Sequence, residues 1–349
     1  MKREAKIKMF KDLFAPKSGE KVLFLIDIPH GDILDNDGWR ERREMAQEWK
    51  KTFDELGVET GFTVDMLEYE ATGMHNSPLP KHVVDAATTS HLVIAMTEYS
   101  ASSSLLPISR AEGTITRCVS MPGAERRMEN TAFTADYSDV KTYAVALETM
   151  LTKAIGAEIL FSTGDRLYID LRNRTAEADT GECTSPGDCI NFPSGEGYIA
   201  PYEAVGDEVN KFGYSKTQGV LPVDYNGELV TYVIEQNRIV DIVGAGKKVE
   251  EMSTFFSENE TRRNIAELGV GCNPEAVITG NILEDEKVGL HIAYGMSTHL
   301  NGKVKSDTHL DICYSKGCPV EGTTVTLIDA DGSTIELIRD AILRYELLK

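Results

Sequence analysis

A continuous apolar run near the N-terminus constrains the fold more than any other feature of the sequence. Lys21–Ile28 reads KVLFLIDI, which is typical of a strand buried on both faces of a parallel sheet. Residues 39–56 follow with helical periodicity and dense alternating charge. The same alternation continues with strand signals at 62–69, 92–97 and 114–119 and helix signals at 107–113 and 137–155. The first 155 residues therefore predict an open α/β sheet domain.

The second half of the chain has a different pattern of secondary-structure signals, because short strand signals follow one another from residue 158 onwards. Further signals predict a hairpin, a helix and a closing helix at residues 229–243, 248–258 and 341–348. The charged run Glu284-Asp-Glu-Lys287 is interpreted as a solvated turn. We predict an N-terminal α/β domain over residues 1–155 and a β-rich α+β metal-binding catalytic domain over residues 156–349. The active site is expected in the crevice between them.

The charge of the chain limits its partners. It has 36 basic and 56 acidic residues, which gives a formal net charge of −20. Nucleic acid and anionic membranes are disfavoured as partners, because phosphate binding depends on clustered lysine and arginine. No segment has the roughly 18 consecutive apolar residues of a membrane span, and residues 1–17 lack the apolar centre of a signal peptide. We therefore expect a cytoplasmic protein that acts on a small peptide or another small molecule.

Histidines gather in the second half of the chain. Three of the seven, His291, His299 and His309, fall within 19 residues. His309-Leu310-Asp311 lies in a run with the alternation of a strand, where residues i and i+2 point to the same face about 7 Å apart. His309 and Asp311 can therefore converge on one ion or on two adjacent ions. His291 lies in another predicted strand bounded by glycines, where other backbone can approach closely. The pattern predicts a divalent-metal site.

Longer motifs around these histidines resemble a known family. The motifs are Asn191-Phe-Pro-Ser-Gly-Glu196, Glu267-Leu-Gly-Val-Gly271, Asn273-Pro274, Asp285-Glu286-Lys287, His291-Ile-Ala293 and His309-x-Asp311. In this order they resemble the aminopeptidase T/aminopeptidase S type metallopeptidases, the thermophilic-type leucyl aminopeptidases. That family also includes members similar to 2,5-dihydroxypyridine dioxygenase. The resemblance covers about residues 156–349.

This resemblance implies a two-metal hydrolase. Position by position, the family's metal ligands correspond to Glu196, Glu267, His291, His309 and Asp311. Two divalent ions of zinc, cobalt or manganese would share a bridging water, and Glu196 would act as the catalytic group that moves its proton. The implied function is that of an aminopeptidase, a metalloprotease that releases N-terminal residues from small peptides. The resemblance also implies a homodimer.

Three residues are candidates for substrate binding. The peptidases carry a tyrosine seven residues after the histidine of the His-Ile-Ala motif, where it can donate to the oxyanion, but Thr298 stands there in this chain. Tyr294 is close in sequence, although on a strand it would point away from His291. Ser103, in a serine-rich segment, is a third candidate. The missing tyrosine sets this chain apart from the peptidases.

Two alternatives to hydrolysis stay open. Residues 92–100 and 120–123 resemble the ring-cleaving 2,5-dihydroxypyridine dioxygenase branch, which binds one ferrous ion through two histidines and a carboxylate. His291, His309 and Asp311 would supply such an Fe(II) triad here. That branch is expected to carry one histidine at the position of Glu267 and another in the serine-rich segment. The second alternative is a metal-binding homologue without peptidase activity.

Overall fold

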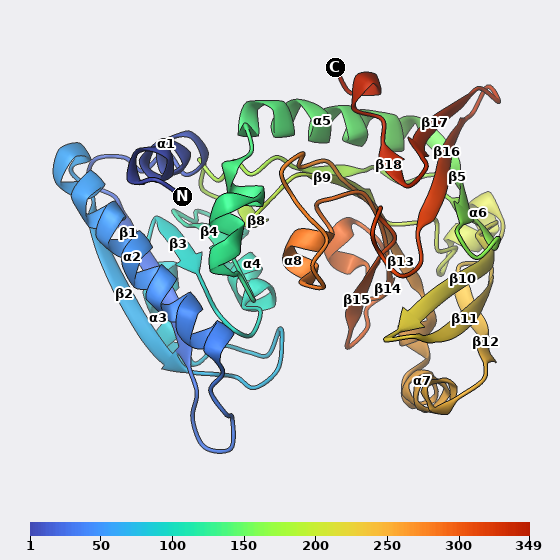
Figure 1. Ribbon diagram of the computed structural model, residues 1–349, viewed down its shortest axis with the longest axis horizontal. Helices are drawn as coiled ribbons and strands as arrows, with labels where there is room; N and C mark the ends of the chain where they lie inside the picture. Colours follow the sequence, from blue (N-terminus) through green and yellow to red (C-terminus); the bar gives the residue numbers. More distant parts are fainter. The chain divides into compact units, whose positions relative to one another are not determined.

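The apolar run Lys21–Ile28 forms strand β1 inside a parallel sheet in the computed structural model, which describes residues 1–349 (Figure 1). The sheet has five strands in the order β2-β1-β3-β4-β8, and every neighbouring pair is parallel. Its strands are β1 (Lys21–Ile28), β2 (Thr63–Glu70), β3 (Leu92–Ala95), β4 (Arg117–Ser120) and β8 (Cys189–Asn191). The buried parallel sheet predicted from the apolar run is therefore confirmed.

Helices accompany these strands, because parallel strands need long crossover connections. They are α1 (Arg3–Leu13), α2 (Asp37–Thr60), α3 (Lys81–Thr88) and α4 (Ser102–Ser109), with the 3-10 helices η1 (Arg126–Asn130) and η2 (Ala132–Thr134). Helix α2 begins where Asn36 Oδ1 accepts a hydrogen bond from the Trp39 N–H at 2.8 Å. Helix α4 begins at Ser102 rather than at the predicted residue 107, because Pro107 lies inside the helix and not at its start.

Two antiparallel sheets make up the β-rich part of the chain. The larger has the order β12-β11-β10-β6-β5-β16-β17-β18, and the smaller has the order β15-β14-β13-β9-β7. The larger sheet contains β5 (Ala154–Phe161), β6 (Arg166–Asp170), β10 (Gln218–Tyr225), β11 (Glu228–Glu235), β12 (Arg238–Gly244), β16 (Gly322–Asp329), β17 (Thr334–Arg339) and β18 (Ile342–Leu343). The smaller sheet contains β7 (Glu177–Asp179), β9 (Glu196–Ile199), β13 (Ile265–Gly271), β14 (Leu290–Gly295) and β15 (His309–Cys313).

Few helices accompany these sheets. They are α5 (Tyr137–Lys153), α6 (Glu208–Phe212), α7 (Lys247–Glu258) and α8 (Ile282–Asp285), with η3 (Glu260–Arg263), η4 (Thr298–Leu300) and η5 (Tyr345–Leu347). The predicted closing helix over residues 341–348 is wrong. Asp340 and Ala341 have left-handed φ angles of 52° and 61°, which a right-handed helix does not contain, and Ile342 pairs with β17 instead.

Contacts divide the chain into two compact units, residues 1–137 with 181–194 and residues 138–180 with 195–349. The sequence placed the division between residues 155 and 156. In the structure nearly all of α5 belongs to the second unit, and the segment 181–194 returns to the first unit, where β8 joins the parallel sheet. The predicted α/β fold class is confirmed.

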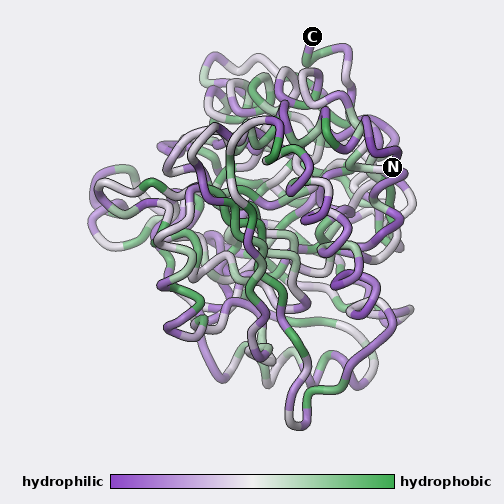
Figure 2. The backbone as a smooth tube through the Cα atoms, turned by 90° about the vertical axis from the view of Figure 1, so that its left-hand side faces the viewer, coloured by the Kyte–Doolittle hydropathy of each residue, from purple (hydrophilic) through white to green (hydrophobic).

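The core of the second unit explains why one sheet face is available for polar side chains. In Figure 2, where the left-hand side of Figure 1 faces the viewer, hydrophobic segments run through the middle of the picture and several outer loops are hydrophilic. Leu268 and Ile292 of the smaller sheet pack in one core cluster with Leu221 and Val325 of the larger sheet. The opposite face of the smaller sheet is therefore outside this core. None of the helices combines the length and apolar character that a membrane crossing requires.

Candidate metal centre

The smaller antiparallel sheet places all five predicted ligands on neighbouring strands (Figure 1). Glu196 begins β9, Glu267 lies in β13, His291 lies in β14, and His309 and Asp311 lie in β15. Side chains along a strand alternate between the two faces, and the apolar residues between these ligands pack into the core. The ligand side chains therefore share the other face, as predicted for His309 and Asp311.

Small residues on the same face leave room for these polar side chains. Gly269 lies directly across from His291, and a Cβ atom at Gly269 would collide with the His291 imidazole. Ala293 lies between Glu267 and Asp311 in the register of the three strands. Gly269 therefore accommodates a side chain. The close backbone approach predicted for the glycines that bound the His291 strand is found at Gly295, where a Cβ atom would collide with the carbonyl group of Thr308.

Glu267, His309 and Asp311 form a first donor group, which we name the open group. Each offers one ligand atom, and these atoms lie within 4.8 Å of one another. His309 Nε2 is 3.1 Å from Glu267 Oε2 and 3.4 Å from Asp311 Oδ1. The side chains of His309 and Asp311 are 15% and 18% exposed, so solvent reaches this group.

The orientation of His309 fits a metal ligand. Its Nδ1 lies 2.7 Å from the carbonyl oxygen of Met296, and a carbonyl can only accept, so Nδ1 carries a proton. The Nε2 atom then faces two carboxylate oxygens, where either a proton on Nε2 or a divalent ion among the three atoms would satisfy them. A metal-binding histidine commonly donates its other ring N–H to a carbonyl in this way. One imidazole and two carboxylates are a donor set that fits a divalent ion.

Glu196, Glu267 and His291 form a second donor group, which we name the closed group. Their ligand atoms also lie within 4.8 Å of one another. His291 Nε2 is 3.3 Å from both Glu267 Oε1 and Glu196 Oε2. The His291 side chain is only 1% exposed, and Glu196 Oε1 accepts a hydrogen bond from Lys287 Nζ at 2.6 Å. This group is therefore buried and already contacts a cation.

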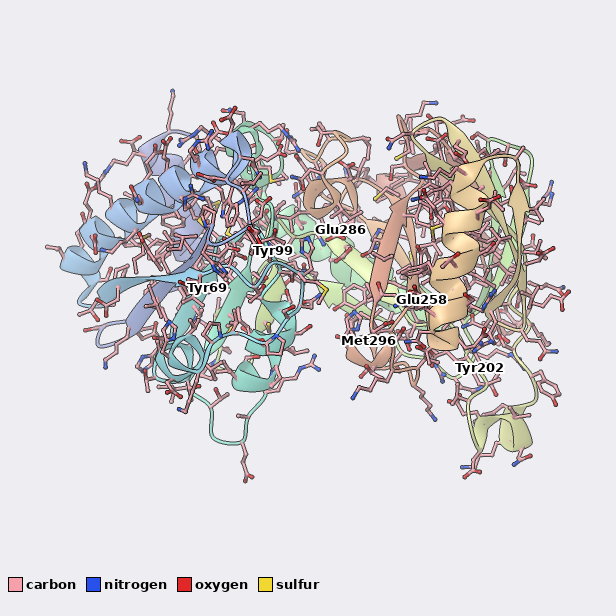
Figure 3. The ribbon with its side chains drawn as sticks, turned by 90° about the horizontal axis from the view of Figure 1, so that it is seen from below. Tyr69, Tyr99, Tyr202, Glu258, Glu286 and Met296 are labelled. Carbon is pink, nitrogen blue, oxygen red and sulfur yellow. The ribbon has the colours of Figure 1, made fainter.

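The solvated turn predicted for residues 284–287 is wrong. The Lys287 side chain is fully buried, and its Nζ lies 2.7 Å from Glu286 Oε1 and 4.0 Å from Asp179 Oδ2. Glu284 and Asp285 are also buried. Figure 3 marks Glu286 in this segment, which connects α8 to β14. The sequence did offer a signal for this burial, because the lysine lies among carboxylates directly before a glycine-bounded apolar strand.

The charges of the two groups shift one another's pKa values. Burial alone would raise the pKa of Glu267, but hydrogen bonds with His291 and His309 outweigh it and hold this pKa well below its usual range. Burial lowers the pKa of His291, but Glu267 and Glu196 raise it to about 9. Burial raises the pKa of Glu286 to about 8. Such strongly perturbed groups cluster at functional sites.

The predicted substrate-binding residues lie in three different environments. Tyr294 is buried on the core face of β14, and its ring contacts the rings of Tyr232 and Phe256. Thr298 is exposed at the start of η4. Ser103 is exposed in α4 of the first unit. Tyr294 is therefore a core residue, whereas substrate binding by Thr298 and Ser103 stays a prediction.

His299 is a functional candidate to which the sequence assigned no role. Its imidazole is half-buried, and its ring centroid lies 4.6 Å from that of His309 in an edge-on arrangement. The clustering of three histidines in the sequence was the available signal. The structure brings this third histidine against the open group.

Comparisons with known proteins show the family to which this arrangement belongs. The family model described as 2,5-dihydroxypyridine 5,6-dioxygenase, NicX, matches residues 41–332. The chain belongs to the NicX family. The solved structure of 2,5-dihydroxypyridine dioxygenase from Pseudomonas putida KT2440 has the same fold, with a TM-score of 0.68 and 17% identity over 99% of this chain and 98% of that chain. Comparison with curated proteins gives no match.

Membership of the NicX family overturns the predicted hydrolase function. The family consists of dioxygenases, so the aminopeptidase, metalloprotease and hydrolase assignments are wrong, and the ring-cleaving alternative agrees better with the match. The peptidase-like motifs indicate only that residues able to bind a metal lie on particular strands. They do not indicate the reaction, because one fold can support different reactions with similar ligands. An enzyme of a dioxygenase family with these donor groups indicates a metal cofactor.

Proposed function

We propose that this chain is a ring-cleaving dioxygenase that uses one non-haem ferrous ion and acts on a small dihydroxylated ring such as 2,5-dihydroxypyridine. The observation that carries the proposal is the open group, in which three donor atoms converge within 4.8 Å. Its partial exposure leaves positions for a substrate next to the ion, as a catalytic metal site requires. Family membership supports the reaction class.

The donor set differs from the triad predicted for this alternative. His291 does not share a group with His309 and Asp311, and Glu267 takes the third place instead. The set therefore has one imidazole and two carboxylates, whose two negative charges offset a divalent ion. Carboxylate donors also suit manganese, so we expect manganese to compete with iron for this centre.

The residues hold the ion, and the ion supplies the redox chemistry. When bound, a ferrous ion supplies the electron transfer that dioxygen needs to react with the ring. In ring cleavage one carbon–carbon bond breaks and both atoms of one dioxygen molecule enter the product, so no separate reductant is consumed. His309, fixed through Met296, and the carboxylates of Glu267 and Asp311 would hold this ion, and the partial exposure of His309 and Asp311 would leave access for the substrate.

Metal analysis and oxygen uptake test the proposal. Protein purified without chelator should contain iron, and the ferrous-loaded protein should consume about one dioxygen molecule per molecule of 2,5-dihydroxypyridine, whereas zinc-loaded protein should consume none. Asp311→Ala should abolish oxygen uptake. Asp307→Ala is the matched control, because this carboxylate pairs with Arg262 at 2.7 Å.

The opposite result would be equally clear. Ferrous-loaded protein that consumes no oxygen with dihydroxylated pyridines or benzenes would contradict the proposed function. The metal-binding homologue without turnover would then account for the chain.

A further inference from the structure

We infer that Lys287, Glu196 and His291 form a buried chain of polar contacts that takes the place of a second divalent ion and holds Glu267 toward the open group. This inference rests on the proposed function only for the assignment of one catalytic ion to the open group. It changes the predicted roles of Glu196 and His291 from metal ligands to positioning residues.

The first observation is the cation already inside the closed group. Lys287 Nζ lies 2.6 Å from Glu196 Oε1, and its side chain is fully buried. Glu286 and Asp179 also face this ammonium group, at 2.7 Å and 4.0 Å. A buried ammonium ion is tolerated only when it is paired, so these three carboxylates fix its position. The carboxylate of Glu196 is therefore shared with a permanent cation.

The second observation is that the two carboxylate oxygens of Glu267 face different histidines. Oε2 lies 3.1 Å from His309 Nε2 in the open group, and Oε1 lies 3.3 Å from His291 Nε2 in the closed group. A carboxylate that binds an ion through one oxygen is oriented by a hydrogen bond to the other. His291 Nε2 is placed to make that bond, and Glu196 Oε2 lies 3.3 Å from the same nitrogen.

Exposure separates the two groups further. A catalytic metal needs an open coordination position, and the open group has side chains that are 15% and 18% exposed. The side chains of the closed group are 1%, 7% and 10% exposed. A substrate can reach an ion in the open group, whereas the closed group offers no comparable access. Burial suits a supporting role.

The charges along the chain also alternate. The ammonium of Lys287 contacts the carboxylate of Glu196, the His291 imidazole follows, and the carboxylate of Glu267 then faces the ion position. Glu196 thus has the ammonium at one oxygen and the His291 imidazole near the other, and Glu267 has an imidazole near each oxygen. A second divalent ion would have to compete with the ammonium for Glu196.

One atom offers the competing explanation. Glu196 Oε2 is buried, and its contact with His291 does not have the geometry of a hydrogen bond. This oxygen is where a second ion would bind. Substitutions of Lys287 and Glu196 therefore distinguish the two arrangements.

The test is calorimetric titration of metal-free protein with Mn²⁺, combined with elemental analysis. We expect one bound ion per chain for the natural protein and two for Lys287→Met, because removal of the ammonium frees Glu196. Lys303→Met is the matched control: this lysine pairs with Glu208 at 2.9 Å but is half-exposed, so its removal should leave one ion bound. Two ions in the natural protein, or one in a folded Lys287→Met protein, would overturn the inference.

Glu196→Gln keeps the inference testable if Lys287→Met does not fold. We expect this variant to bind one ion still, with an affinity about tenfold to a hundredfold lower, because the support of Glu267 is weakened. Unchanged affinity, or a fall from two ions to one, would contradict the inference. Stoichiometry is measured without substrate, so a protein with one ion and no oxygen uptake contradicts the proposed function alone. A protein with two ions and normal oxygen uptake contradicts only the role of Lys287.

Discussion

Both units of the molecule bury carboxylates, but they surround them with different partners. Asp27, in β1, accepts hydrogen bonds from the backbone N–H groups of Glu98 and Tyr99 at 2.8 Å and 3.1 Å, and from the Trp39 indole at 2.9 Å. Its partners are fixed donors that carry no charge. Glu267 instead faces two imidazoles, whose ring nitrogens can bind either a proton or a metal. Burial alone therefore does not indicate a metal site, and the chemistry of the partners does.

The largest effect that tests this difference is expected from His309→Ala. Removal of the imidazole takes one of three donors from the open group, so metal content should fall by more than about tenfold, as measured by elemental analysis. Asp307→Ala, two residues earlier in the chain, should retain its metal. Full metal content in His309→Ala would contradict the assignment of the open group.

Asp27→Asn tests the structural carboxylate. The substituted amide would turn an NH₂ group toward N–H donors and leave one of them without an acceptor, so the free energy of unfolding should fall by about 1–3 kcal/mol in urea. Metal content should not change. A loss of metal without a loss of stability would show that the comparison between the two carboxylates is wrong.

Glu208→Gln examines a third buried carboxylate, which has permanent cations as partners. Burial raises the pKa of Glu208, but Arg174 and Lys303 outweigh it and lower this pKa to about 2. A lowered pKa stabilises the fold above the ordinary value of 4.5, and this stabilisation is lost as the pH falls toward 2. The variant should be about 1–3 kcal/mol less stable at pH 7, with a difference that shrinks below pH 4.5. A difference that does not depend on pH would argue against these ion pairs.

Local patterns predicted much of this fold. The apolar run of β1 and the alternation of His309-Leu310-Asp311 each predict a strand without any knowledge of tertiary contacts, and both strands are present. The closing helix failed because left-handed residues at 340 and 341 and pairing with β17 override local helix propensity. Strand β8 has three residues, too few for a periodic signal.

The sequence motifs named the five residues that the structure brings together, but not how these residues are divided into two groups. Five candidate ligand residues could be chosen from motifs. The register of four strands then places these residues on one face of the sheet. Nothing local separates the open group from the closed group, because that separation depends on which oxygen of Glu267 faces which histidine. The prediction that Lys287 is solvated failed for a similar reason. A charged residue is expected at the surface unless its partners are known, and two of the carboxylates around Lys287, Asp179 and Glu196, are distant in the sequence.

The carbonyl group of Met296 has a consequence for how the centre tolerates change. Met296, marked in Figure 3, donates its N–H to the Thr308 carbonyl and accepts from the His309 ring, both at 2.7 Å. Its side chain takes no part in either bond. Substitutions at this position should thus be nearly silent, whereas an insertion or deletion between residues 296 and 308 would tilt one peptide group and turn the imidazole. In this loop the length of the main chain, more than its amino-acid identities, sets the orientation of the His309 imidazole.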